Sequence, residues 1–99
     1  NRSGLPSNTR LAVEAMAFGK PVIASRIGAL PEIVGDAQTG FLCEPGDVNG
    51  LRRAIMRLAE DPVLATSLGR AGRLRAEQKY TAEVHYQKIM GVYNEVLAS

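Results

Sequence analysis

Glu14 is the residue whose type and setting most suggest chemistry. It is the only charged residue in the apolar segment 11–18. A carboxylate among apolar side chains needs either a partner or a function, because an unpaired buried charge is strongly unfavourable. The sequence therefore leaves two interpretations, a ligand-binding carboxylate and a structural acid that is satisfied within the fold.

Two further residues with reactive or metal-binding side chains give weaker signals. Cys43 is the only cysteine, so it forms no disulfide within the chain, and its apolar neighbours predict a small buried side chain. His85 has no Cys, His or Asp partner at ligand spacing, which predicts a satisfied or exposed side chain. The sequence offers no Gly-Lys-Ser/Thr phosphate loop, Ser-His-Asp set or pair of metal-binding carboxylates. We therefore expect no metal site.

The segment 52–79 is strongly basic, although the whole chain has a net charge of only +2. Such a surface can attract phosphate polymers or an anionic membrane. It lacks the interleaved aromatic residues of single-strand binders and matches no zinc-finger or RNA-recognition motif. A solvated helix face is the preferred interpretation. The segment holds three acids against seven bases, which are Arg52, Arg53, Arg57, Arg70, Arg73, Arg75 and Lys79.

The elements that must position these residues begin with a loop and a short helix. Residues 1–10 are rich in Ser, Asn, Gly and Pro, which is typical of a loop. A helix over residues 11–18 follows, with Asn8 or Thr9 as its N-cap. Gly19 is expected to end this helix, because glycine readily adopts the left-handed conformation found there.

Two nearly continuous apolar runs, at 21–25 and 40–43, predict strands covered on both faces, as in a parallel sheet. A single helical turn over residues 30–34 lies between them, so the three elements form one βαβ unit. A sheet of two such strands is too small to be stable alone. The sequence therefore predicts the α/β class, as a partial Rossmann-like, doubly wound domain whose other strands precede Asn1.

Three helices are predicted after the second strand. Asp47 caps the first, whose apolar positions 48, 51, 55 and 58 follow helical spacing. Asp61 and Pro62 start the second, which runs to about Gln78 although two glycines weaken its middle. Thr81 caps the last, and the exposed apolar stripe of that helix predicts self-association of the isolated chain.

The size and composition fit one small globular domain. The chain has 99 residues, of which 45% are hydrophobic and 22% are charged, and this composition excludes a disordered tail. No apolar run approaches the roughly 20 residues of a membrane span, and no signal-peptide pattern opens the chain. We expect a cytoplasmic protein, with peripheral contact at the inner membrane face as an alternative.

A series of motifs follows one order through most of the chain. They are EAMAFGKPVIAS at 14–25, GALPEIV at 28–34, TGFL at 39–42 and PGD at 45–47. Together they resemble the donor-binding half of retaining glycosyltransferases of the GT-B fold (group 1, or family 4), which include sucrose synthases, glycogen synthases and bacterial mannosyltransferases. The resemblance covers residues 10–97. It implies that residues 1–99 are the C-terminal portion of a nucleotide-sugar-binding Rossmann-like domain, without the N-terminal acceptor domain.

The resemblance implies a role for Glu14 and for the residues before it. Glu14 matches the family glutamate that hydrogen-bonds the ribose hydroxyls, and a carboxylate offers two acceptor oxygens to such a diol. Backbone N–H groups at the start of the helix, around Arg10, Leu11 and Ala12, are expected to face the diphosphate. The resemblance assigns no catalytic residue to this chain. The expected substrate-binding residues are Glu14, Asn8, Thr9, Arg10 and Leu11.

One acid of the family pattern is missing. The family carries another glutamate eight positions before the ribose-binding one, beside the donor sugar, and Pro6 stands there. No carboxylate occurs anywhere before Glu14. Either Asn8, Thr9 or Arg10 reads the sugar, or the activity is altered or lost. Arg10 either binds the departing β-phosphate and stabilises its charge, or faces solvent.

The loop after the first strand departs from the family at one position. Gly28 and Ala29 stand where the family has a Gly-Gly pair in a tight turn near the cleft. Alanine is tolerated there unless the position requires a positive φ. Glu32 resembles a recurrent family acid and is expected to be structural.

The resemblance implies transfer of a hexosyl group from a nucleoside-diphosphate sugar to an acceptor hydroxyl, with retention of the anomeric configuration. This chain would supply part of the donor site, would be inactive alone and would need no metal or other cofactor. Its implied partners are the donor and a sugar, lipid or other hydroxyl acceptor, and no nucleic acid. Two alternatives remain: a non-catalytic nucleotide-sugar or partner-binding module, favoured by Pro6, and a basic-surface protein that binds membrane or nucleic acid.

Overall fold

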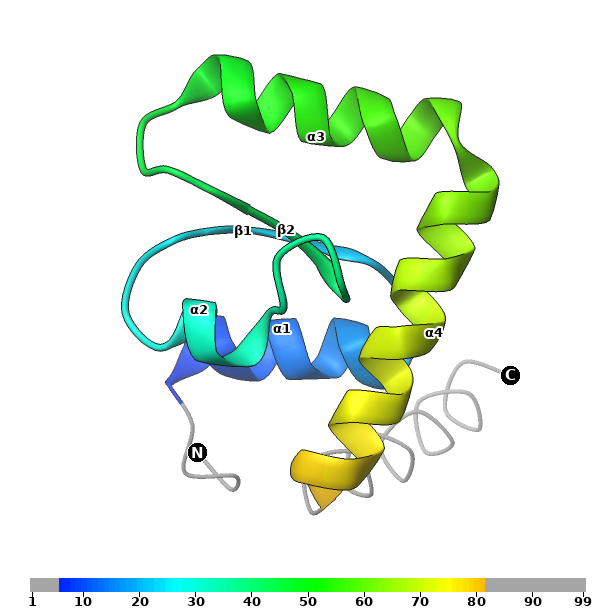
Figure 1. Ribbon diagram of the computed structural model, residues 1–99. Coiled ribbons are helices and arrows are strands. Elements are labelled where there is room, and N and C mark those ends of the chain that lie inside the picture. Colours follow the sequence, from blue (N-terminus) through cyan, green and yellow to red (C-terminus); the bar gives the residue numbers. More distant parts are fainter. Residues whose placement is uncertain (1–5, 82–99) are drawn as a thin grey trace, which may run out of the picture.

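The computed structural model describes residues 6–81, and α-helices and two β-strands alternate through its first half (Figure 1). Within residues 6–81 the order of elements is the predicted one, and the predicted α/β class is confirmed. The elements are α1 (Ser7–Ala17), β1 (Val22–Ser25), α2 (Leu30–Ile33), β2 (Gly40–Cys43), α3 (Val48–Glu60) and α4 (Pro62–Lys79).

The two strands pair in parallel, as predicted. Val22 lies opposite Gly40, and Ser25 lies opposite Cys43. α2 lies within the connection between the strands, which completes the βαβ unit. Most residues of the strands are half-buried, whereas the apolar runs predicted full cover on both faces. Cys43 is accordingly half-buried rather than buried.

Helices flank both faces of this small sheet (Figure 1). α3 lies on one side, while α1 and α2 lie on the other, and α4 runs from the end of α3 past the sheet to α1. The buried core lies where α1, α2 and α4 meet, and its fully buried residues include Val13, Met16, Val34 and Ala76. α1 is therefore held through the face that carries Val13 and Met16, whereas Leu11 on its opposite face is exposed.

α1 begins one turn earlier than predicted. Its first residue is Ser7, and Pro6 occupies the N-cap position without a side-chain cap hydrogen bond. Neither Asn8 nor Thr9 is the N-cap, because both lie inside the first turn. The hydroxyl of Thr9 donates instead to the carbonyl oxygen of Pro6, at 2.8 Å. The end of the helix is as predicted, since Gly19 follows it with a φ of 72°.

Two glycines of α4 face α1 and the turn that follows it. A Cβ atom on Gly69 would overlap the carbonyl oxygen of Gly19. A Cβ atom on Gly72 would lie 3.5 Å from side-chain atoms of Met16 and Thr39, which is ordinary contact. The helix continues through both glycines and ends at Lys79, close to the predicted end at about Gln78. Gly69 permits contact between two backbones.

Aspartates cap α3 and α4, as predicted. The carboxylate of Asp47 accepts a hydrogen bond from the N–H of Gly50, and that of Asp61 accepts one from Leu64, each at 2.9 Å. Asp61 is also the residue that ends α3. The two helices therefore meet at one residue, with no loop between them.

The apolar stripe of α3 has the predicted spacing but is largely exposed. Val48, Leu51 and Ile55 are 65%, 44% and 52% exposed, and Ala54 is the buried residue of this helix. The sheet has only two strands within the described residues, so it covers only part of the stripe. α3 therefore presents an apolar face that residues 6–81 do not bury.

Some predictions fall at or beyond residue 81. The hydroxyl of Thr81 donates to the Glu77 carbonyl oxygen at 2.9 Å, while the helix predicted after Thr81 and the side chain of His85 lie outside the described residues. Among the helices of residues 6–81, none is both long and apolar enough to span a membrane.

Candidate functional site: one face of α1

Glu14 lies at the edge of the core, on the face of α1 that is turned away from it. Its neighbours Val13 and Met16 are fully buried, whereas the side chain of Glu14 is 25% exposed. The Oε1 atom of Glu14 lies 3.7 Å from Nε of Arg10, one helical turn earlier. Both interpretations drawn from the sequence therefore apply in part, because Glu14 has an internal partner and is also accessible.

The predicted site residues divide between two faces of α1. Residues three, four and seven positions apart share a helix face, which places Ser7, Arg10, Leu11 and Glu14 together. Leu11 is 62% exposed, and Arg10 is 33% exposed rather than fully solvent-facing. Thr9 lies on the opposite face, 1% exposed. The structure thus brings Arg10, Leu11 and Glu14 together and separates Thr9 from them.

The backbone donors of the helix start are not those expected from the sequence. The N–H of Arg10 donates to the carbonyl oxygen of Pro6 at 2.9 Å, so the expectation that N–H groups around Arg10, Leu11 and Ala12 are available is wrong. The first-turn N–H groups, which have no acceptor within a helix, belong to Ser7, Asn8 and Thr9. The N–H of Thr9 donates to Oδ1 of Asn8 at 2.9 Å.

Sequence reasoning missed Ser7. This exposed residue opens α1 on the same face as Arg10 and Glu14. Ser7 lies three positions before Arg10 and seven before Glu14, which is the spacing of residues on one helix face. A correct placement of the helix start would therefore have identified Ser7 from the sequence. The candidate site therefore extends from Ser7 to Glu14 along one face of one helix.

A second set of polar residues lies just after the two strands. Arg26 follows β1, and its guanidinium contacts Oε1 of Glu44, which follows β2, at 3.0 Å and Oδ2 of Asp36 at 3.5 Å. Oδ1 of Asp36 accepts a hydrogen bond from the N–H of Leu42. All three side chains are about half exposed or more. They join the loops at the carboxyl end of the sheet, where α/β domains bind ligands.

The turn between β1 and α2 accommodates an alanine at position 29. Gly28 has the positive φ, 53°, while Ala29 has a φ of −87° in the right-handed helical region. The position of Ala29 therefore needs no glycine. Glu32 is exposed, and its carbonyl oxygen accepts a hydrogen bond from Arg75.

The sequence model of the family described as "Glycosyl transferases group 1" matches residues 10–75. The chain belongs to this family. The matched region begins at Arg10 and contains Glu14, whereas Pro6, Ser7 and Asn8 precede it. The resemblance drawn from the motifs is thereby confirmed.

Curated relatives carry the names of glycosyltransferases. The MMP alpha-(1->4)-mannosyltransferase of Mycolicibacterium hassiacum is 41% identical over 88 residues, which is 88% of this chain and 21% of that protein. The glycogen synthase of Mycobacterium tuberculosis is 39% identical over 79 residues, which is 80% of this chain and 18% of that protein. The chain therefore spans about a fifth of the length of these relatives.

Two solved structures of GT-B enzymes share the fold. Sucrose-phosphate synthase from Thermosynechococcus elongatus aligns with a TM-score of 0.69 and 39% identity, covering 89% of this chain and 22% of that one. HepE of Anabaena, solved in complex with UDP, aligns with a TM-score of 0.71 and 29% identity, covering 86% of this chain and 24% of that one. The chain thus shares the fold of a part of these enzymes, and its two parallel strands and flanking helices are consistent with a partial Rossmann-like domain.

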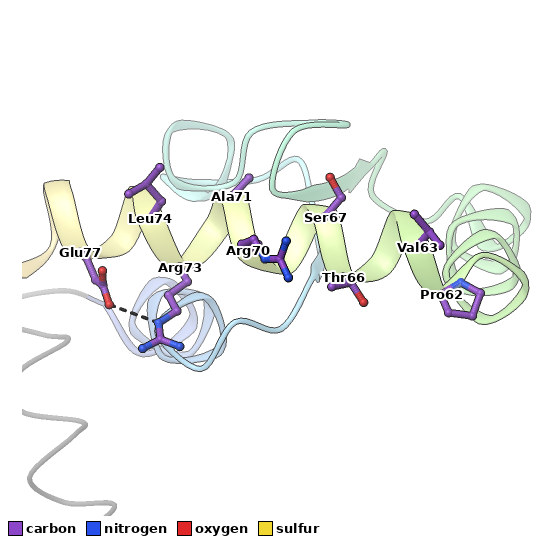
Figure 2. Close-up of a pocket in the computed structure, with 9 residues that line it drawn as sticks. All are labelled: Pro62, Val63, Thr66, Ser67, Arg70, Ala71, Arg73, Leu74 and Glu77. Atoms are coloured by element: carbon purple, nitrogen blue, oxygen red, sulfur yellow. Dashed lines mark hydrogen bonds and ion pairs between the residues drawn. The ribbon is translucent and has the colours of Figure 1, made fainter.

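Several arginines of the basic segment make local contacts. Arg53 lies 3.9 Å from Asp47, Arg57 stacks over the ring of Phe41 at 5.3 Å, and Nε of Arg73 donates to Glu77 at 3.2 Å. Arg73 and Glu77 line a groove of about 910 Å³ along the outer side of α4 (Figure 2). None of the predicted site residues lines this groove.

No cluster of three or more His, Cys, Asp or Glu side chains with metal-binding geometry occurs among residues 6–81. The polar groups of the candidate site are instead a carboxylate, a guanidinium and the N–H groups of a helix start. Such groups can bind hydroxyls and phosphates directly.

Proposed function

We propose that this chain supplies part of the donor site of a retaining glycosyltransferase, which transfers a hexosyl group from a nucleoside-diphosphate sugar to an acceptor hydroxyl. The observation that carries the proposal is the partly exposed Glu14 carboxylate, on the same face of α1 as the first turn of that helix. Glu14 binds the ribose hydroxyls, and the first turn faces the diphosphate.

The spacing along α1 suits such a ligand. Ser7 and Glu14 are seven positions apart, which corresponds to about 10 Å along the helix axis. This is comparable with the length of a ribosyl diphosphate. The positive end of the helix dipole and the first-turn N–H groups favour an anion at Ser7 and Asn8. No divalent metal is needed in this proposal, because the helix dipole and the first-turn N–H groups stabilise the negative charge of the phosphates.

The related HepE structure supports the nucleotide part of the proposal. That protein was solved with UDP bound and shares the fold of this chain at 29% identity. A nucleoside diphosphate is therefore the ligand class to test first.

Pro6 supports a second candidate function, a nucleotide-sugar-binding module without catalysis. The family pattern has a glutamate at this position, and the structure places a proline there as the N-cap of α1. No carboxylate precedes Glu14 in the sequence. A module of this kind would bind the nucleotide through Glu14 but would not transfer the sugar.

Calorimetry of the full-length protein with UDP, GDP and ADP tests the binding site. We expect one of the three to bind, and we expect Glu14→Ala to weaken that binding by about tenfold or more, the effect of losing a charge-assisted hydrogen bond. Glu60→Ala is the matched control, because Glu60 is an exposed glutamate on α3 and its loss should leave affinity unchanged.

Turnover of the matching sugar donor distinguishes the enzyme from the module. NMR of the product is expected to show the anomeric configuration of the donor. Binding without transfer would favour the module, and an unchanged affinity in Glu14→Ala would refute the assignment of Glu14 in both.

A further inference from the structure

Arg10 and Glu14 form an ion pair that is only partly open to solvent. Their side chains are 33% and 25% exposed, and Nε of Arg10 lies 3.7 Å from Oε1 of Glu14. Helical side chains lean toward the N-terminus, so the Glu14 carboxylate extends back over the turn that carries Arg10. The guanidinium therefore lies beside the carboxylate that the proposed function assigns to ribose binding.

The order of the two charges is not the one that best stabilises a helix. A base near the N-terminus opposes the helix dipole, and α1 has no acid in its first turn to offset this. A glutamate that precedes a base by four residues is the more favourable order, whereas here the base comes first. Helix stability alone gives little reason for this pair.

The Nε atom of Arg10 is also buried without a hydrogen-bond partner among the described residues. A buried donor of this kind is unfavourable until it finds an acceptor. The separation from Oε1 of Glu14 exceeds ordinary N–H···O distances by about 0.5 Å. A small shift of either side chain would therefore close a hydrogen bond that fixes the carboxylate.

We propose that Arg10 is a positioning residue, which holds the Glu14 carboxylate in the orientation that accepts hydrogen bonds from the ribose of a nucleoside diphosphate. This inference rests on the proposed function. It assigns Arg10 to the sugar of the nucleotide, through Glu14, rather than to the departing phosphate.

Ribose selectivity tests this role. The full-length protein is titrated with whichever of UDP, GDP or ADP the wild type binds, and with the 2′-deoxy form of the same nucleotide. Arg10→Met is expected to lower the preference for ribose over 2′-deoxyribose by about three- to tenfold, part of the effect of a charged hydrogen bond. In Glu14→Gln the preference is already reduced, so adding Arg10→Met should lower it no further.

α4 offers a matched control. Arg73 and Glu77 are also four residues apart in the same order, and Nε of Arg73 lies 3.2 Å from Oε1 of Glu77 (Figure 2). This pair is outside the candidate site. Arg73→Met removes the same atoms from a helix and should leave the ribose preference unchanged.

The remaining outcomes overturn the inference in distinguishable ways. If Arg10→Met weakens the binding of the ribonucleotide and of the 2′-deoxyribonucleotide equally, Arg10 interacts with the phosphates. In that case only this inference fails, and the proposed function stands. If the wild type binds no nucleotide, the proposed function fails with it. Arg10→Lys provides a second variant should the methionine variant unfold. Lysine keeps the charge but has no Nε donor, and it too should lower the preference.

Discussion

At Gly69, the backbone of α4 touches the backbone that ends α1. A Cβ atom there would overlap the carbonyl oxygen of Gly19, and neither backbone can move away without displacing its helix. Gly72, three residues later, faces the side chains of Met16 and Thr39 at ordinary contact distance. The same substitution at these two positions should therefore have opposite results.

Gly69→Ala is expected to lower the free energy of unfolding by about 1 to 3 kcal/mol, the range typical of overpacking. This loss should occur although alanine favours a helix over glycine by about 1 kcal/mol. Urea denaturation of the full-length protein measures the change. Gly72→Ala is the control and should leave stability unchanged or raise it, and equal losses in both variants would contradict the close contact.

The candidate site could be predicted in part from residue spacing. Arg10 and Glu14 are four residues apart in an apolar segment, so a helix at this position necessarily places them together. Thr9 could not be placed correctly, because its orientation depends on where the helix begins. That start is set by Pro6, whose carbonyl oxygen accepts from the Thr9 hydroxyl, and several polar residues competed for the cap in the sequence.

Among the elements, the junction of α3 and α4 depends on a single side chain. Asp61 ends one helix and caps the next, and its carboxylate accepts the N–H of Leu64. Because no loop separates the helices, the cap also fixes the direction in which α4 leaves α3. α4 in turn carries the contacts that hold α1.

Asp61→Ala is expected to lower the free energy of unfolding by about 1 kcal/mol, the usual effect of losing an N-cap. Asp61→Asn keeps an acceptor oxygen at the same place and should retain most of the stability. Thermal and urea unfolding, followed by circular dichroism, measure both variants. If Asp61→Asn lowers the free energy of unfolding as much as Asp61→Ala does, the N-cap hydrogen bond is not what stabilises the junction.

The strands and the caps of α3 and α4 were predictable because their signals are local. Residues 40–43 form a continuous apolar run, and Asp47 and Asp61 each stand directly before a helical pattern. The exposure of α3 was not predictable from its own sequence, because spacing shows that a helix has an apolar face but not what covers it. The width of the sheet determines how much of the apolar face of α3 is covered. With two strands in residues 6–81, Ala54 is the buried residue of this helix.

On the scale of the whole molecule, much apolar surface is left uncovered. Nine large hydrophobic side chains within residues 6–81 are exposed, among them Val48, Leu51 and Ile55 on one stripe of α3. Contiguous apolar surface on a soluble protein usually marks an interaction site. Together with the stripe predicted after Thr81, this favours association of the 99-residue chain when it is produced alone.

Sedimentation velocity of the isolated 99-residue chain tests this expectation over a range of concentrations. We expect species heavier than the 10.6 kDa monomer, and Ile55→Lys should shift the distribution toward the monomer, because it places a charge in the stripe. Asn49→Lys adds the same charge at an exposed polar position of α3 and should have no such effect. A monomer at every concentration would contradict the prediction.

The contact between Gly19 and Gly69 also has a consequence for synthesis on the ribosome. The two residues are 50 positions apart in the chain, so α1 is complete long before the helix that covers Val13 and Met16 exists. At about 5 to 20 residues per second, this interval lasts about 3 to 10 s. During this time the core face of α1 lacks the cover that α4 later provides.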